Sequence, residues 1–103
     1  MQQALEEAAE VPLTIAERCS QIVDLAMPAA EMGNQWAVSD AGVGVLLAEA
    51  AMRAALLNVT INLASIKDAG FVQDVEARIA AFTADKAEAK DRVMSVVNEK
   101  IRA

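Results

Sequence analysis

Two asparagines in an otherwise apolar segment are the residues of this chain best placed to do chemistry. Asn58 and Asn62 stand four residues apart with almost no charge around them, so a helix would present both amides on one face. An amide that is buried there without a partner costs about 1 to 3 kcal/mol. Two interpretations stay open: the amides bond across a helix interface and fix its register, or they line a ligand pocket.

A second polar group lies where one helical pattern ends and the next begins. Gly33 can adopt the left-handed conformation that ends a helix, and Asn34 tolerates that conformation next best. Ser39 and Asp40 are both favoured as N-cap residues of the following helix. The alternative is a ligand loop, because free amides beside a helix N-terminus can hold an anionic or carbonyl group. The helix dipole keeps Asp40 ionised, so it suits a hydrogen-bond acceptor better than a general acid.

Two long helices are predicted to position these residues. Apolar residues recur at steps of three and four over residues 5–31, which predicts an amphipathic helix that Pro12 either kinks or restarts. Residues 41–66 predict a second helix whose only charges, Glu49 and Arg53, have the favourable four-residue spacing. Because that helix is apolar nearly all round, it is expected to be central and buried.

A third helix is expected to start at Asp68, which can cap it, and to carry an apolar stripe as far as Ile101. Lys86 interrupts the stripe, so the helix is expected either to extend past the bundle or to bend near Thr83. The pattern contains no independent strand. We therefore predict an all-α fold, a single domain over residues 1–103, in which about three long helices form a bundle that dimerisation completes.

Glycines and a tryptophan near the start of the second helix indicate close packing. Gly42 and Gly44 each cost about 0.5 to 1 kcal/mol relative to Ala inside a helix, so a neighbouring helix is expected to approach both. Trp36, in the preceding loop, is expected to cover an edge of the core in preference to stacking on a ligand ring. These residues therefore predict close packing around the loop and the start of the second helix.

Composition narrows the classes of function. The 103 residues carry a net charge of −6, and the nine Lys and Arg are scattered, so no basic surface for nucleic acid is expected. The chain has one Cys and no His, so a structural zinc site is excluded and no metal ligands are predicted. No secretory signal is readable at the N-terminus, and charges in the apolar segment argue against a membrane span. The predicted location is the cytoplasm.

The polar motifs together carry a family resemblance. The order GN-x-x-A-x-SD over residues 33–40, an Ala-rich helix, and LNV-x-INL-x-x-I-x-D over residues 57–68 resembles the formiminotetrahydrofolate cyclodeaminase and methenyltetrahydrofolate cyclohydrolase family. The similarity extends back to Ala8 and forward to about Phe71. It implies a tetrahydrofolate derivative as substrate or ligand, no metal or redox cofactor, and ligand binding by the two polar groups: Gly33, Asn34, Ser39, Asp40, Asn58 and Asn62.

The resemblance covers only the second half of such a domain. Family members are about twice this length and open with a Gly-rich PGGGS-type turn and an Asp-Glu-Asp segment that holds the catalytic acid, and neither occurs here. We therefore assign no catalytic residue. The first interpretation is a truncated member, inactive alone or dependent on a separate N-terminal half. The alternative is a self-associating helical interaction module without catalysis, most simply a homodimer. A fragment of a complete enzyme would give the same pattern.

Overall fold

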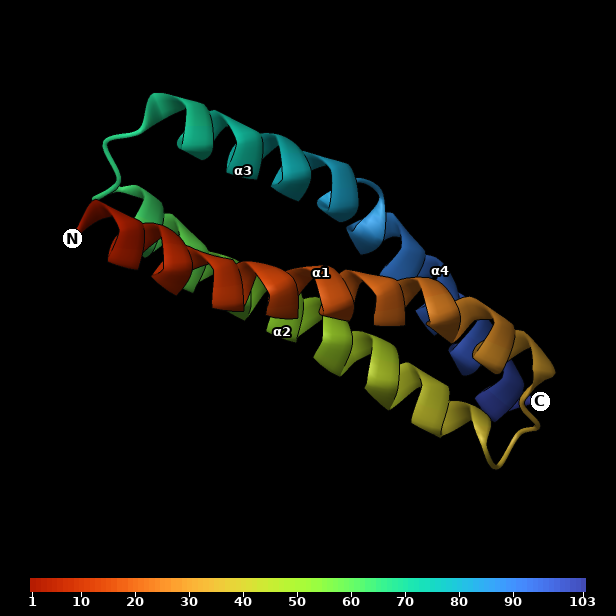
Figure 1. Cartoon of the computed structure of the whole chain (residues 1–103). Helices are drawn as coiled ribbons and strands as arrows, with labels where there is room; N and C mark the ends of the chain where they lie inside the picture. The colour runs from red at the N-terminus through yellow and green to blue at the C-terminus, as the bar shows by residue number, and fades with distance from the viewer.

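The chain folds into four helices without strands, and the computed structural model describes all 103 residues. In chain order the helices are α1 (Gln2–Met32), α2 (Val38–Leu63), α3 (Ala69–Thr83) and α4 (Lys86–Arg102). The first two form an antiparallel hairpin, and α3 and α4 follow one another back along it, so that the C-terminus lies near the α1–α2 turn (Figure 1). The result is a rod of 56 × 18 × 15 Å. The predicted all-α bundle is confirmed.

The third predicted helix is divided in two. Asp68 caps α3 as expected, its Oδ1 accepting a hydrogen bond from the Phe71 amide at 3.1 Å. The helix then ends at Thr83, and Asp85 adopts a left-handed conformation with φ 64° before α4 begins. Lys86 follows at once and pairs with Asp24 of α1 at 3.1 Å. One uninterrupted helix from Asp68 to Ile101 is therefore wrong, whereas the bend near Thr83 is confirmed.

Helix α1 continues without a break through both of its prolines. Pro12 and Pro28 lie inside the helix, so the fresh start considered for Pro12 does not occur. Small side chains on its inner face allow α2 to pack closely along its length, since Ala9, Ala16 and Ala30 are fully buried. This long alanine-lined seam between α1 and α2 is the main interface of the molecule.

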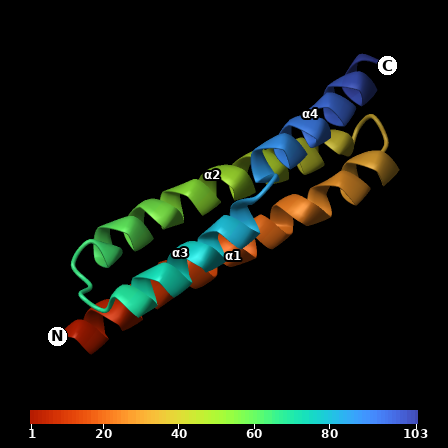
Figure 2. The same cartoon turned by 90° about the horizontal axis from the view of Figure 1, so that it is seen from above.

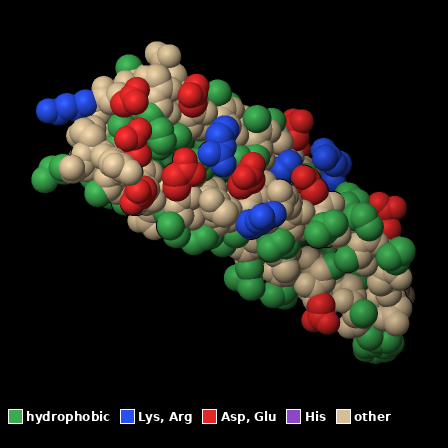
Figure 3. Space-filling view, in the orientation of Figure 1, with side chains coloured by type: hydrophobic (Ala, Val, Ile, Leu, Met, Phe, Trp, Pro, Cys, Tyr) green, Lys and Arg blue, Asp and Glu red, His purple; other side chains and the backbone are tan.

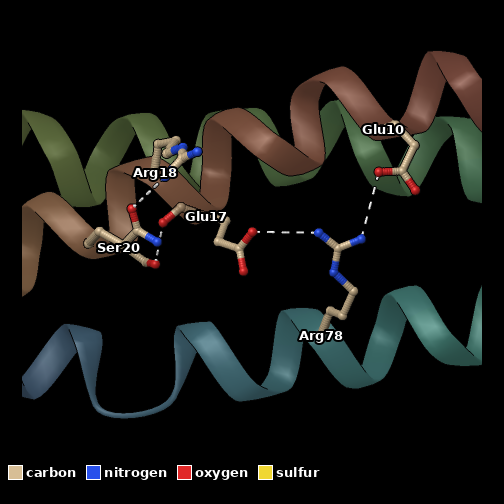
Figure 4. A network of polar contacts seen from close by, with 6 residues as sticks. Glu10, Glu17, Arg18, Ser20 and Arg78 are labelled. Atoms are coloured by element: carbon tan, nitrogen blue, oxygen red, sulfur yellow. Dashed lines mark hydrogen bonds and ion pairs between the residues drawn. The ribbon is translucent and has the colours of Figure 1, made fainter.

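Three clusters of buried side chains lie along the rod. The middle one consists of Ala16, Met52 and Ala55 of α1 and α2, and a larger and a smaller one flank it. The larger one joins α1, α2 and α4 near the α1–α2 turn, and its members are Val23, Ala26, Ala30, Val38, Val45, Ala48, Val93 and Val97. The smaller one joins α1, α2 and α3 through Leu13, Val59 and Val75. Beyond this cluster α3 is attached to α1 by ion pairs of Arg78 with Glu10 at 3.7 Å and with Glu17 at 3.5 Å (Figure 4). These side chains are about half exposed, so the pairs add little to stability.

Figure 2 shows α3 and α4 lying one after the other along the α1–α2 hairpin, and the two helices differ in what they pack against. Helix α4 packs against both α1 and α2, whereas α3 packs mainly against α1 and meets α2 through side chains of the smaller core. The half of α2 that ends at Leu63 therefore has fewer neighbours than the half that begins at Val38. This difference decides where grooves remain open.

Helix α2 is not the buried central helix that its composition predicts. A row of its side chains, which we call the apolar face of α2, is 44–72% exposed and consists of Val43, Leu46, Leu47, Leu57 and Ile61. In Figure 3, charged side chains gather over α1, α3 and α4, whereas the lower edge, where α2 runs, carries mainly hydrophobic ones. The expectation fails because helices from one chain cover only one side of α2. The predicted Glu49–Arg53 ion pair forms on this helix.

By length and composition, α2 is the one helix that could cross a membrane. That property is a weak indication, because the packed helix of a soluble protein has the same composition. Its residues from Val38 to Val59 supply members of all three clusters described above. The structure therefore gives α2 a packing role within the bundle.

Candidate functional site

The turn between α1 and α2 is built around Asn34. Its side-chain Oδ1 accepts hydrogen bonds from the amides of Trp36 at 3.0 Å and Ala37 at 2.9 Å, and its carbonyl accepts from the Val38 amide at 2.9 Å. Asn34 thus closes the turn and satisfies amides at the start of α2. The amides of Asn34 itself and of Gln35 have no partner in the chain. The predicted ligand loop therefore presents two free donors.

Gly33 ends α1 for a reason other than the one predicted. Its backbone is extended, with φ −70° and ψ 144°, so the left-handed conformation expected there is wrong. A Cβ on this residue would lie 2.9 Å from the Ala29 carbonyl oxygen. The Gly33 amide donates to that same carbonyl. Glycine is needed because the backbone closes tightly on the last turn of α1.

The predicted N-caps of α2 lie inside the helix. Ser39 and Asp40 fall in its first turn, because α2 begins at Val38, and neither is its N-cap residue. Asn34 accepts instead from the amides of Trp36 and Ala37, just before the helix. Both side chains are exposed and point from the first turn of α2. The capping interpretation is therefore wrong for both, and their oxygens are free of that role.

Trp36 lies on the surface of this turn. Its side chain is 84% exposed, so the expectation that it covers an edge of the core is wrong. Met32, at the end of α1, is 83% exposed nearby in the chain. The indole is thus accessible to anything that binds the turn.

Asn62 makes one of the two helix-interface bonds expected of the asparagine pair. Its Nδ2 donates to the Ala8 carbonyl of α1 at 3.3 Å and to the Asn58 carbonyl at 3.0 Å. In a regular helix the Ala8 carbonyl would accept from the residue four positions later, which is Pro12 and has no N–H. Asn62 therefore supplies the donor that Pro12 lacks, and the helix-interface interpretation holds for it.

Asn58 does not share that role. Its side chain is exposed and makes no hydrogen bond within the chain, so it is not held across the α1–α2 interface, and a bond to a second copy stays a prediction. Both amides line an open groove of roughly 550 Å³ between α1 and α2, with Ala8, Val11, Pro12, Ile15 and Ile61. Within this groove Asn62 is occupied by the backbone, and Asn58 is free to meet a ligand.

The structure does not bring the six predicted ligand residues together in one chain. Gly33, Asn34, Ser39 and Asp40 gather at the turn, whereas Asn58 and Asn62 lie about 27 and 33 Å further along α2 than Asp40, at 1.5 Å per residue. Asp68 caps α3 at the far end of α2 from Asp40. Asp40 and Asp68 are therefore not placed across one water molecule, as acid and base catalysis of hydrolysis by this pair would require.

Lys100 of α4 completes the turn, and no motif predicts it. Its Nζ donates to the carbonyls of Ala30, Glu31 and Gly33 at 2.5–2.7 Å. The last turn of α1 contains no basic residue of its own, although a cation is favourable at that end of a helix. That absence is the only signal in the sequence that another element supplies the charge. Lys100 thus belongs with Asn34 among the residues that set the turn.

The packing of α4 against the start of α2 confirms one of the two glycine predictions. A Cβ on Gly42 would meet Val97 Cγ1 of α4 at 3.1 Å, so a neighbouring helix does approach there. Around Gly44 no atom lies within 4 Å of such a Cβ. The expected close approach at Gly44 is therefore wrong.

What these features define is a helical hairpin with a polar turn at one end and an amide-lined groove at the other. The chain belongs to the formiminotransferase-cyclodeaminase family, whose model matches residues 1–81. Helix α4, with Lys100, lies beyond the matched residues.

Three relatives extend this match. The methenyltetrahydrofolate cyclohydrolase of Methylorubrum extorquens is 36% identical over 101 residues, which are 98% of this chain and 49% of that protein. The formimidoyltransferase-cyclodeaminase of Gallus gallus is 30% identical over 97% of this chain and 18% of that protein. Its counterpart from Rattus norvegicus is 33% identical over 79% of this chain and 15% of that protein. The chain thus spans about half the length of the bacterial relative and under a fifth of the two animal ones.

Proposed function

We propose that this chain is one half of a cyclohydrolase or cyclodeaminase-type domain that handles a one-carbon derivative of tetrahydrofolate in the cytoplasm. In this proposal the chain supplies ligand contacts, and a second half supplies the acid or base. Membership of the family and the names of the relatives support the class of ligand. The chain matches 49% of the bacterial relative, and this supports the proposal that a second half supplies the remaining groups.

The apolar face of α2 is the observation that carries this proposal. Five aliphatic side chains, each at least 44% exposed, form one row beside the groove that holds Asn58. Burying apolar surface is worth about 25 cal/mol per Å², so a row of this length favours a covering partner. A second half that covers the row would also close the groove over the free Asn58 amide. That amide can both donate to and accept from a pteridine ring.

The chemistry requires a group that this chain does not place. Hydrolysis of a methenyl carbon needs a positioned water and a proton acceptor or donor within about 3 Å of it. Asp40 and Asp68 stand at opposite ends of α2 and cannot share that water. The second half must therefore bring the acid or base to the groove or to the turn.

A complementation assay tests the proposal. The chain alone is expected to hydrolyse 5,10-methenyltetrahydrofolate no faster than buffer, and to gain activity when the uncovered part of the Methylorubrum relative is supplied as a second polypeptide. Asn58→Ala should reduce the restored activity, whereas the control Gln73→Ala, on the exposed surface of α3, should not. Hydrolysis by the chain alone that disappears in Asp40→Asn would contradict the proposal and make Asp40 catalytic.

A second candidate function is a self-associating helical module, and the same apolar face supports it. In this case the partner is a second copy, most simply related by a two-fold axis. Leu57→Lys should convert the dimer to a monomer in light scattering at micromolar concentration. Leu25→Lys is a matched control, because Leu25 lies on α1 and is 69% exposed against 70% for Leu57. A parent chain that is monomeric and melts cooperatively would rule the dimer out.

A further inference from the structure

The last turn of α1 depends on a charge from a different helix. Helix ends leave carbonyls without intrahelical partners, and here the carbonyls of Ala30 and Glu31 both accept from Lys100 Nζ. The third bond goes to the Gly33 carbonyl at 2.7 Å, one residue beyond the helix. A lysine ammonium has three donors, so all three are used on this one segment of backbone.

The Gly33 bond has a consequence on the opposite side of the same peptide unit. The peptide between Gly33 and Asn34 is planar and trans, so its C=O and its N–H point in opposite directions. Holding the carbonyl against Lys100 therefore fixes the direction of the Asn34 N–H, which has no partner in the chain. A cation on the carbonyl also polarises the peptide and strengthens its N–H as a donor.

Helix α4 is itself packed against both α1 and α2 near the turn. Val97 is buried among residues of α1 and α2 in the larger core and lies against Gly42 of the first turns of α2. Lys100 follows Val97 by three residues and so stands on the same side of α4. A well-packed helix therefore holds the Lys100 ammonium group in place, and the Lys100 side chain is only partly exposed.

We propose that Lys100 is a positioning residue that orients and polarises the Gly33–Asn34 peptide, so that the Asn34 N–H is a preset donor for a carbonyl or carboxylate oxygen of the ligand. The nature of the ligand rests on the proposed function. The orientation of the peptide does not, and it can be measured without any ligand. The two parts can therefore fail separately.

Nuclear magnetic resonance of the ligand-free chain tests the orientation. Lys100→Met should shift the Gly33 carbonyl carbon and the Asn34 amide nitrogen, and should speed hydrogen exchange of the Trp36 and Ala37 amides relative to amides of the α1–α2 seam. Lys100→Arg should restore most of these signals, because it keeps the charge and the donors. Lys90→Met is the matched control: it removes the same charge from α4, where Lys90 pairs with its neighbour Asp91, and should leave the turn unchanged.

Unchanged Gly33 and Asn34 signals in Lys100→Met would overturn the proposal, and so would a uniform rise in exchange along the whole chain. If that variant does not fold, the parent chain supplies the test. Three hydrogen bonds should slow exchange of the Lys100 ammonium protons until they are visible, unlike those of the exposed Lys67. Their absence under conditions that detect slowly exchanging ammonium groups would equally overturn it.

The ligand part is tested with 5-formyltetrahydrofolate as a stable probe. Lys100→Met should weaken its binding roughly tenfold, because the Asn34 N–H would no longer be held and polarised for the ligand, while Lys100→Arg stays close to the parent. An equal affinity for parent and Lys100→Met would overturn the ligand role of Asn34. If the parent does not bind the probe at all, the proposed function fails, while the ligand-free signals still decide the role of Lys100.

Discussion

The two ends of the rod are built from the same two helices and have opposite character. At the α1–α2 turn, α4 covers both helices, Asn34 closes the backbone, and Lys100 satisfies the carbonyls that α1 leaves free. At the other end α3 packs mainly against α1 and meets α2 only through the small cluster of Leu13, Val59 and Val75, and open grooves of roughly 430 and 550 Å³ flank α2. The apolar composition of α2 is similar throughout. The two halves of the helix therefore differ in exposure because different helices pack against them.

The largest expected effect tests the small core that holds α3 against α1 and α2. Leu13 is fully buried and joins α1 to Val59 and Val75, so Leu13→Ala should lower the free energy of unfolding by about 2 to 5 kcal/mol. Leu25→Ala, at a position 69% exposed on the same helix, should change it by no more than about 0.5 kcal/mol. Urea denaturation measures both. Similar losses for the two variants would mean that the open end has no core of its own.

An intermediate effect separates the two asparagines of the groove. Asn62→Leu removes the donor that replaces the missing N–H of Pro12, so it should cost about 1 kcal/mol of stability. Asn58→Leu should cost less than about 0.5 kcal/mol, because the Asn58 side chain makes no hydrogen bond that the substitution would remove. In a Pro12→Ala background the Ala8 carbonyl regains a helical donor, and the loss caused by Asn62→Leu should largely disappear. A loss that persists in that background would mean that Asn62 acts elsewhere.

This prediction also shows how far the sequence leads. Spacing and apolarity are enough to place the helices, the bend near Thr83 and the cap at Asp68, because these depend on local backbone chemistry. They cannot separate Asn58 from Asn62, since the two share one helix face and only the approach of Pro12 on α1 distinguishes them. Lys100 is equally invisible, because its acceptors lie about 70 positions earlier in the chain. Ser39 and Asp40 do not cap α2 because the helix begins at Val38, three residues before the predicted start at residue 41.

The smallest expected effect probes how tightly each part of α2 is covered. Gly44→Ala should raise the free energy of unfolding by about 0.5 to 1 kcal/mol, because no atom lies within 4 Å of the added Cβ. Gly42→Ala gains the same helix propensity but presses on Val97 Cγ1 at 3.1 Å, so its net stabilisation should be smaller or reversed. Thermal denaturation of both variants measures the difference. An equal gain for the two would mean that α4 yields freely at the turn.

The slender shape of the chain gives its assembly a distinct hydrodynamic signature. The Cα radius of gyration is 16.4 Å, against about 13 Å for a compact domain of this length. A partner that covers the apolar face of α2 lies alongside the rod, so it thickens the particle and leaves its maximum dimension close to 56 Å. A partner that binds the turn extends the rod instead and lengthens that dimension. Small-angle scattering therefore identifies which surface is occupied, even before the partner is known.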